Sequence, residues 1–355
     1  MGTILIKNGR IWDGEGFYFA DLLTKDDKIA KISPDIKDEA DFIFDATGKT
    51  VSAGLVDAHT HLKGISTEHF AINAEAVCFP FGVTAAADAA AELGDRNTVK
   101  QIGVKTCVYV ATEIKANRAY FEKTLKYLEA FGEEAIGVKV YFDTTGGEAK
   151  DINPLKQICD FAFDRNLKVM VHCSYSPTKM SEILDCLKEG DTLTHAFHGA
   201  PNTAEEDGFE AIKAAQKRGV IIDAGLAGHV HTDFAVFKNA IKSGVIPDVI
   251  STDITKLSAF KRGGRYGLNM CMSIAKDLGM KEEDIFRAVT SSPAKTLQKA
   301  GEWGILKEGG NADLCVLDYG YEPYSLTDKA GNRVENKKGY QSILTISDGN
   351  VVYRR

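Results

Sequence analysis

The amino-acid sequence predicts an α/β fold: a (β/α)8 TIM barrel that carries a small β-sandwich built from both ends of the chain. Short apolar runs separated by turn residues fill both ends. Between them, apolar runs alternate with longer helix-like segments, which is the pattern of a parallel sheet covered by helices. Eight such units over about 250 residues match the size of a (β/α)8 barrel. An open doubly wound sheet is the alternative, although no G-x-G-x-x-G motif follows any expected strand.

The two chain ends have the pattern of closely spaced short strands. Residues 3–52 place turn pairs such as Asn8-Gly9 between apolar runs, and the pattern returns from Gly301, with a hairpin turn at Asp348-Gly349 or Gly349-Asn350. One such layer cannot bury both of its faces. We therefore assign residues 1–52 and 303–355 to one β-sandwich domain and residues 53–302 to the barrel. The charged stretch 325–339 is expected to form a surface loop.

The barrel strands are expected where apolar runs are nearly continuous, because strands of a parallel sheet are buried on both faces. Glycine often precedes the next run, as at Gly219 and Gly244, which fits helix C-caps and tight turns. The expected strands cover residues 51–58, 81–87, 104–111, 136–142, 167–174, 191–197, 220–226 and 248–254.

Composition excludes several classes of partner. The net charge of -7 argues against nucleic acid and anionic membranes. No apolar run reaches the length of a membrane span, and the N-terminus lacks the features of a signal peptide. The seven cysteines are scattered, with no C-x-x-C pair, which predicts that they are buried, reduced thiols. We expect a cytoplasmic protein that acts on a small molecule; a homo-oligomer stays open, because no surface stripe specifies its assembly.

Chemically active side chains follow the expected strands. Chemistry in a parallel barrel lies at the C-terminal ends of the strands. Strand alternation puts His59 and His61 on the same face, where they can hold a divalent metal. A single histidine or aspartate at a strand end is more often structural, but six residues at equivalent positions indicate a metal-binding rim. The other four are Lys139, His172, His195 and Asp253.

Lys139 is the most informative of the six. It stands between Val138 and Val140 on a strand predicted to be central, so its side chain faces the barrel interior. A lone buried ammonium is very costly. Carboxylated on Nζ by CO2, the same side chain becomes a carbamate anion that can bridge two metals. The alternative, a surface lysine on an edge strand, fits the apolar flanks poorly.

These residues, in this order and together with Asp57, resemble the amidohydrolase superfamily with a binuclear metal site. The resemblance covers nearly the whole chain and includes the segments 54–57, 290–294 and 309–313. Within the superfamily, the segments 194–199 and 223–229 are most similar to the dihydroorotase-like group of deacetylases that act on N-acetyl or O-acetyl compounds.

The resemblance implies two divalent metal ions, for which nitrogen and carboxylate ligands suit zinc, with manganese or iron left open. It places His59, His61, carboxylated Lys139 and Asp253 on one ion. It places Lys139, His172 and His195 on the other. A bridging hydroxide is then the nucleophile, Asp253 the general base and later the acid, and Asp57 orients a histidine.

Substrate contacts are less well defined. The resemblance suggests that His229 contacts the substrate, whereas His231 matches no family role and is expected at the surface. His198 either supports the site or is structural. Tyr141 lies on the strand face of Lys139 and is a candidate wall of the pocket. The basic residues that could bind a substrate carboxylate are Lys63, Arg118, Arg262 and Arg265.

The predicted function is metal-dependent hydrolysis of a small amide or ester, at carbon–nitrogen bonds other than peptide bonds, by a deacetylase of N-acetyl or O-acetyl acids. A ring-opening hydrolase of the dihydroorotase or hydantoinase type is the alternative. Lys63 stands where dihydroorotases carry an arginine, which puts their usual carboxylate contact in doubt. Mononuclear deaminases lack the lysine on strand four, so Lys139 argues against deamination. A non-enzymatic binding protein would be expected to have lost ligands.

Overall fold

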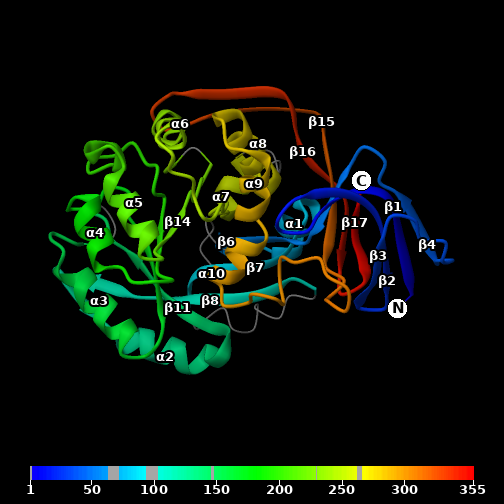
Figure 1. Cartoon of the computed structure of the whole chain (residues 1–355). Coiled ribbons are helices and arrows are strands. Elements are labelled where there is room, and N and C mark those ends of the chain that lie inside the picture. Colours follow the sequence, from blue (N-terminus) through cyan, green and yellow to red (C-terminus); the bar gives the residue numbers. More distant parts are fainter. Residues whose placement is uncertain (1, 63–71, 93–102, 145–147, 229, 262–265) are drawn as a thin grey trace.

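The structure is a computed structural model that describes residues 2–62, 72–92, 103–144, 148–228, 230–261 and 266–355. A helix-rich lobe lies beside a lobe of strands that contains both chain termini (Figure 1). The expected α/β fold is confirmed, because the helix-rich lobe is built on a parallel sheet. Among the described helices, none is both long and apolar enough to cross a bilayer. All seven cysteines are free, as predicted, and six of them are buried.

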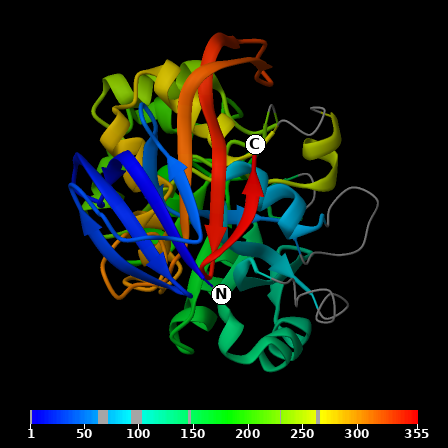
Figure 2. The same ribbon diagram turned by 90° about the vertical axis from the view of Figure 1, so that its right-hand side faces the viewer.

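Strands from both chain ends share one eight-stranded sheet, in the order β17-β16-β15-β5-β1-β2-β3 with β4 paired to β1. Figure 2 shows the N-terminal and C-terminal strands of this sheet in one lobe. Its strands are β1 (Thr3–Trp12), β2 (Phe17–Lys25), β3 (Lys28–Ser33), β4 (Phe42–Asp45), β5 (Thr50–Ala53), β15 (Leu314–Thr327), β16 (Arg333–Ser347) and β17 (Asn350–Arg354). Side chains at alternate positions, such as Ile4 and Ile6 or Leu344 and Ile346, form its core.

The parallel sheet has seven strands, in the order β14-β13-β12-β11-β8-β7-β6. They lie where the sequence predicts strands and are β6 (Leu55–Thr60), β7 (Val83–Ala91), β8 (Lys105–Ala111), β11 (Ala135–Tyr141), β12 (Lys168–His172), β13 (Thr192–Thr194) and β14 (Ile221–Asp223). The predicted strand 51–58 is divided at Gly54, and its first half belongs to the terminal sheet. A Cβ at Gly54 would lie 2.0 Å from the Thr84 Oγ1, so only glycine allows this close approach.

The eighth predicted strand, residues 248–254, is not a regular strand, but it lies between the two edges of the parallel sheet. On one side, the Ala224 and Leu226 amides donate to the carbonyls of Val249 and Ser251, at 3.0 and 3.1 Å. On the other side, the Asp253 amide donates to the His59 carbonyl at 2.8 Å. Asp253 has a φ of +48°, which interrupts the extended conformation that a regular ladder needs.

Helices pack around the parallel sheet and bury one apolar face each, as α3 does with Leu155, Ile158 and Ala162. The α-helices are α1 (Ala74–Cys78), α2 (Glu122–Phe131), α3 (Asn153–Phe163), α4 (Met180–Cys186), α5 (Glu210–Lys217), α6 (Phe234–Lys242), α7 (Lys256–Lys261), α8 (Leu268–Leu278), α9 (Glu282–Ala288) and α10 (Ser291–Thr296). Short additional elements are η1 (Phe79–Phe81), η3 (Gly132–Glu134), η4 (Ala204–Asp207), β9 (Glu113–Lys115) and β10 (Arg118–Tyr120).

The stretch 325–339 corrects the sequence-based expectation of a loop. It forms the outer half of the hairpin β15–β16, in which Thr327 pairs with Arg333. This hairpin leaves the terminal sheet and reaches over the helix-rich lobe as far as α6 (Figure 1). Many side chains of this arm are exposed, so its sequence lacks the apolar alternation by which strands are recognised.

Candidate metal centre

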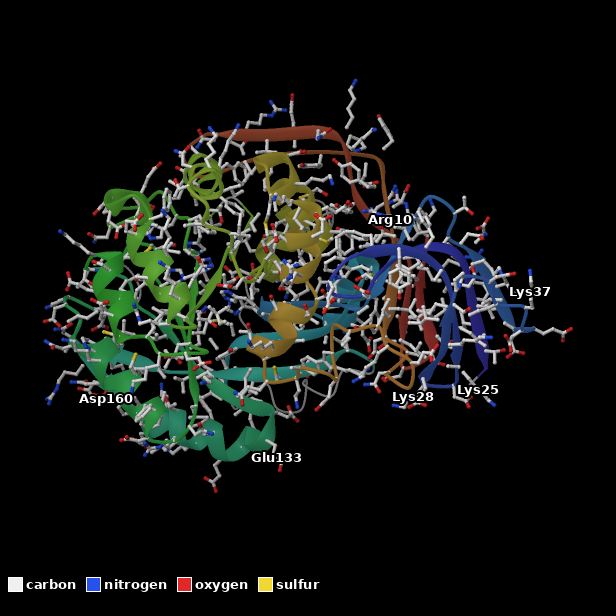
Figure 3. All side chains as sticks on the ribbon, viewed as in Figure 1. Arg10, Lys25, Lys28, Lys37, Glu133 and Asp160 are labelled. Atoms are coloured by element: carbon white, nitrogen blue, oxygen red, sulfur yellow. The ribbon has the colours of Figure 1, made fainter. Side chains whose placement is uncertain are left out.

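Six side chains converge at the C-terminal ends of the parallel strands. Parallel strands bring their carboxyl ends to one rim, so residues far apart in sequence meet there. All six side chains are buried, whereas charged residues such as Glu133 and Lys37 point outward (Figure 3). The converging residues are those that the sequence predicts: His59, His61, Lys139, His172, His195 and Asp253.

The first group of candidate metal ligands contains His59, His61 and Asp253. Their ligand atoms all lie within 4.8 Å of one another. One carboxylate oxygen of Asp253 lies 2.8 Å from His61 Nε2 and 3.2 Å from His59 Nε2. Burial raises the pKa of Asp253, but the neighbouring histidines outweigh burial and hold it below its ordinary value. Asp253 is therefore ionised at neutral pH.

Lys139 lies beside this group. Its side chain is fully buried, and its Nζ lies 3.0 Å from His59 Nε2. Burial lowers the pKa of Lys139 to about 8, so about a tenth of the amine is uncharged at pH 7 and more at higher pH. The alternative of a surface lysine is wrong; the bridging role stays a prediction.

The second group contains His172, His195 and His231, whose ligand atoms also lie within 4.8 Å of one another. The expectation that His231 lies at the surface is therefore wrong. Its ring centroid is 4.2 Å from that of His195 and 4.7 Å from that of His172. The Asp233 amide donates to the Phe197 carbonyl at 2.9 Å and, with a bridge between His198 and Thr232, fixes the loop of His231 against the rim.

The orientation of His195 depends on Gly225. His195 Nδ1 lies 2.6 Å from the Gly225 carbonyl oxygen. An imidazole Nδ1–H that donates to a carbonyl leaves Nε2 as the lone pair for a metal. A Cβ at residue 225 would lie 2.8 Å from His195 Nδ1 and 2.4 Å from the Thr194 Oγ1, and the φ there is +47°. Glycine is therefore required at this contact.

A hydrogen-bond chain that sequence reasoning missed orients His59. The Thr194 hydroxyl donates to Asp223 Oδ2 at 2.7 Å, and Ser251 donates to the same carboxylate at 2.8 Å. Because its only proton is used, the Thr194 oxygen accepts from His59 Nδ1–H at 2.9 Å. His59 Nε2 is thus unprotonated and faces the site. The available signal was that Thr194 and Asp223 are polar residues inside the predicted strands 191–197 and 220–226; in the structure they end β13 and β14.

His59, His172 and His195 are uncharged at neutral pH. Burial, with the positive charge of Lys139 second, lowers the pKa of His59 to about 4. Burial also places the pKa values of His172 and His195 well below the ordinary histidine value. Neutral imidazole is the form that binds a metal, so no proton has to be lost at these positions.

Asp57 contributes differently from the expectation. Its carboxylate accepts from the Thr252 hydroxyl at 2.6 Å, from the Thr252 amide at 3.1 Å and from the His59 amide at 3.4 Å. These contacts join the 248–254 segment to β6, and none of the three involves an imidazole ring. Burial raises the pKa of Asp57 to about 7.

The candidate substrate contacts have different positions. Tyr141 lies at the centre, with its ring centroid 5.6 Å from that of His172. His198 is buried, and its Nδ1 accepts from the Ala200 amide at 3.2 Å. Arg118 is exposed on β10. Lys63, His229, Arg262 and Arg265 lie outside the described residues.

A cavity of about 250 Å³ adjoins the second histidine group. His231 and His198 line it together with Tyr175 and Lys329, the last from the tip of the β15–β16 hairpin. This volume is slightly below the range of about 300–1,000 Å³ that is typical of pockets for drug-sized ligands. A small molecule in this cavity would therefore lie beside His231, the member of the second histidine group that lines it.

The donor set fits two divalent cations. Each group offers three converging donor atoms, and the other carboxylate oxygen of Asp253 lies 3.8 Å from His195 Nε2, so Asp253 is close to both groups. Neutral imidazoles with one carboxylate are the ligands that zinc favours, and they also accommodate manganese or iron.

Comparisons with known proteins agree with this geometry. A "Deacetylase" of Enterococcus faecalis is 27% identical over 371 residues, covering 98% of both chains. A "Dihydroorotase" of Bacillus cytotoxicus is 23% identical, covering 99% of this chain and 98% of its own. A solved dihydroorotase structure superposes with a TM-score of 0.88 at 23% identity, over 100% of this chain and 98% of the other, which shows the shared fold.

The sequence model of the amidohydrolase family matches residues 50–352, which include all of the converging side chains. The resemblance predicted from the HxH motif, Lys139, His172, His195 and Asp253 is thereby confirmed. The chain belongs to the amidohydrolase family and is a hydrolase.

Proposed function

We propose that the protein is a metal-dependent deacetylase that hydrolyses the amide or ester bond of a small N-acetyl or O-acetyl compound. The observation that carries the proposal is the pair of donor groups, buried His59–His61–Asp253 and the group of buried His172 and His195 with half-buried His231, beside a small-molecule cavity. Deacetylases of Enterococcus faecalis and Brucella anthropi, 27% and 26% identical to this chain, support the choice of reaction.

In this proposal, His59, His61 and Asp253 would hold one divalent cation, and His172 and His195 would hold the other. When bound, such cations polarise the scissile carbonyl and lower the pKa of a water molecule. Lys139 reaches the first group through its contact with His59. Its uncharged amine could add to CO2, with one N–H proton released to solvent, and the resulting carbamate would supply an anionic ligand to the centre.

Asp253 carries the proton in this mechanism. Its carboxylate is ionised and lies within 4 Å of both His61 Nε2 and His195 Nε2. It accepts a proton from the attacking water and then donates that proton to the leaving nitrogen or oxygen. Tyr141 and His198 border the space in which the acyl group would lie.

The finer description of the fold is also a proposal. Residues 248–254 bond to β14 and to β6 and so take the place of an eighth strand, which would close the parallel sheet into a (β/α)8 barrel of residues 53–302. The terminal strands, from residues 1–52 and 303–355, would form the accompanying β-sandwich.

Acetate release tests the proposed function. The zinc-loaded protein should release acetate from some N-acetyl amino acids or O-acetyl hydroxy acids when both enantiomers of each are offered. One enantiomer should be preferred, because the side chains that line the cavity form a chiral environment around the substrate. Metal-stripped protein is the control and should be inactive.

Cyclic amides are the second candidate substrates, since a relative named dihydroorotase matches nearly the full chain. If no acetyl compound is hydrolysed while dihydroorotate or a hydantoin is opened in parallel wells, the deacetylase proposal is wrong. Mononuclear deaminases lack the lysine on strand four, whereas Lys139 is one of the converging side chains here. We therefore do not expect the protein to release ammonia from purines.

A further inference from the structure

The tip of the β15–β16 hairpin is fixed to the start of α6. Asp328 is buried, and its carboxylate accepts from the Phe234 amide at 2.7 Å and from the Asn332 amide at 2.8 Å. The Asn332 side chain also donates to Asp233 at 3.2 Å. These contacts join the hairpin to the helix-rich lobe and give its tip a defined place beside the cavity.

This anchoring holds Lys329 at the cavity wall. Lys329 Nζ lies 4.2 Å from the ring centroid of Tyr175, which also lines the cavity. The Tyr175 carbonyl accepts from the Thr144 amide at 3.0 Å, and Tyr175 has a φ of +61°. A non-glycine residue in this strained conformation requires support from its surroundings, so the aromatic support of Lys329 is itself held in place.

The charge of Lys329 is available to a ligand. Among the described residues, no carboxylate lies within salt-bridge distance of its Nζ. Asp233 is the acidic residue of the same wall, but its Oδ1 already accepts from the Ala235 and Val236 amides and from Asn332. Among the described residues that line the cavity, Lys329 is therefore the one cation that an anion meets, at the wall that the hairpin provides.

The cavity thus has two chemically different ends. His231 is beside His195 and His172, the candidate metal ligands, and Lys329 is on the exposed hairpin tip. A small molecule with its acyl bond at the histidine end can extend toward Lys329. An ammonium and a carboxylate form a charge-assisted hydrogen bond, which also selects orientation.

We propose that Lys329 is a specificity-determining residue that binds the carboxylate of the substrate, so the enzyme prefers acylated acids to their neutral analogues. This inference rests on the proposed function. Lys329 belongs to the hairpin of the terminal sheet and is far in sequence from every candidate metal ligand. The substrate class is that of N-acyl amino acids and O-acyl hydroxy acids.

The test compares an N-acetyl amino acid with its carboxamide analogue. In the analogue a neutral carboxamide replaces the carboxylate, and the scissile N-acetyl group is the same. The Lys329→Ala variant should lose roughly 10- to 100-fold in kcat/KM for the acid, the usual value of a hydrogen bond to a charged group. For the acid, the loss in Lys329→Ala should appear mainly as a higher KM. Hydrolysis of the carboxamide analogue by the same variant should hardly change. Lys329→Arg should keep most of the preference. Lys337→Ala, an exposed lysine of the same hairpin, is the matched control and should behave as the wild type.

The outcomes separate this inference from the proposed function. The role of Lys329 is wrong if the wild type hydrolyses the carboxamide analogue and the acid equally well. It is also wrong if Lys329→Ala keeps the preference for the acid. In both cases the deacetylase proposal stands. If both compounds lose activity equally in Lys329→Ala, its role is structural and the inference is likewise wrong. If the wild type hydrolyses no acetyl compound of either series, both proposals are wrong.

Discussion

Replacement of Lys139 by alanine is expected to reduce turnover below about 1% of the wild type, since changes that merely support a metal ligand already cost about 10–100-fold. The wild-type side chain is fully buried and contacts His59 Nε2 at 3.0 Å. Its removal takes away the proposed anionic ligand between the two donor groups. Metal analysis of the purified variant should show the loss of at least one cation per chain.

Two further variants make this result specific. Lys139→Met fills most of the space of the lysine but has no amine, and it should be as inactive as Lys139→Ala. Equal loss in both variants would show that the missing amine, and not the cavity left by truncation, causes the loss of activity. Lys126→Ala removes an exposed lysine that pairs with Glu122 on α2 and should leave activity and metal content unchanged. Full metal content and turnover in Lys139→Ala would refute the binuclear proposal.

Replacement of Asp253 by asparagine is expected to lower kcat by about 100- to 10,000-fold, the range of general acid–base catalysis, with a much smaller change in KM. Asparagine keeps the shape of the side chain but cannot accept the proton. Asp160→Asn, on the exposed face of α3, is the matched control. Metal content is measured in parallel, because Asp253 is also a candidate ligand; an unchanged kcat would remove Asp253 from the mechanism.

The pH dependence follows from the same carboxylate. Neighbouring histidines keep the pKa of Asp253 below its ordinary value despite burial, so the group is already ionised above about pH 5. Its own titration should therefore not limit the wild-type rate between about pH 5 and pH 8.

Local sequence patterns predicted the parts of the structure that depend on strand alternation. His59 and His61 share a face because they are two residues apart on β6, and Lys139 is buried because β11 is central in the sheet. Seven parallel strands formed where continuous apolar runs predicted them. The six converging side chains could be named for the same reason, since parallel strands end at one rim.

The remaining features depend on contacts between distant segments. Asp253 leaves the extended conformation, and the hydrogen bonds that fix its segment come from β6 and β14. His231 lies in a loop, where no periodicity sets the direction of a side chain, and the pairing with residues 197–198 decides its place. Lys329 reaches the cavity because Asp328 bonds to the start of α6, a contact between residues 94 positions apart.

The central claim is that the two donor groups bind two divalent cations, and the most direct test is anomalous diffraction from crystals of the zinc-loaded protein, with metal analysis of the same sample. We expect two ions per chain: one contacting His59, His61 and Asp253, the other contacting His172 and His195, with density for a carboxylated Lys139 between them. A single ion, or ions that lie outside these two groups, would contradict the account.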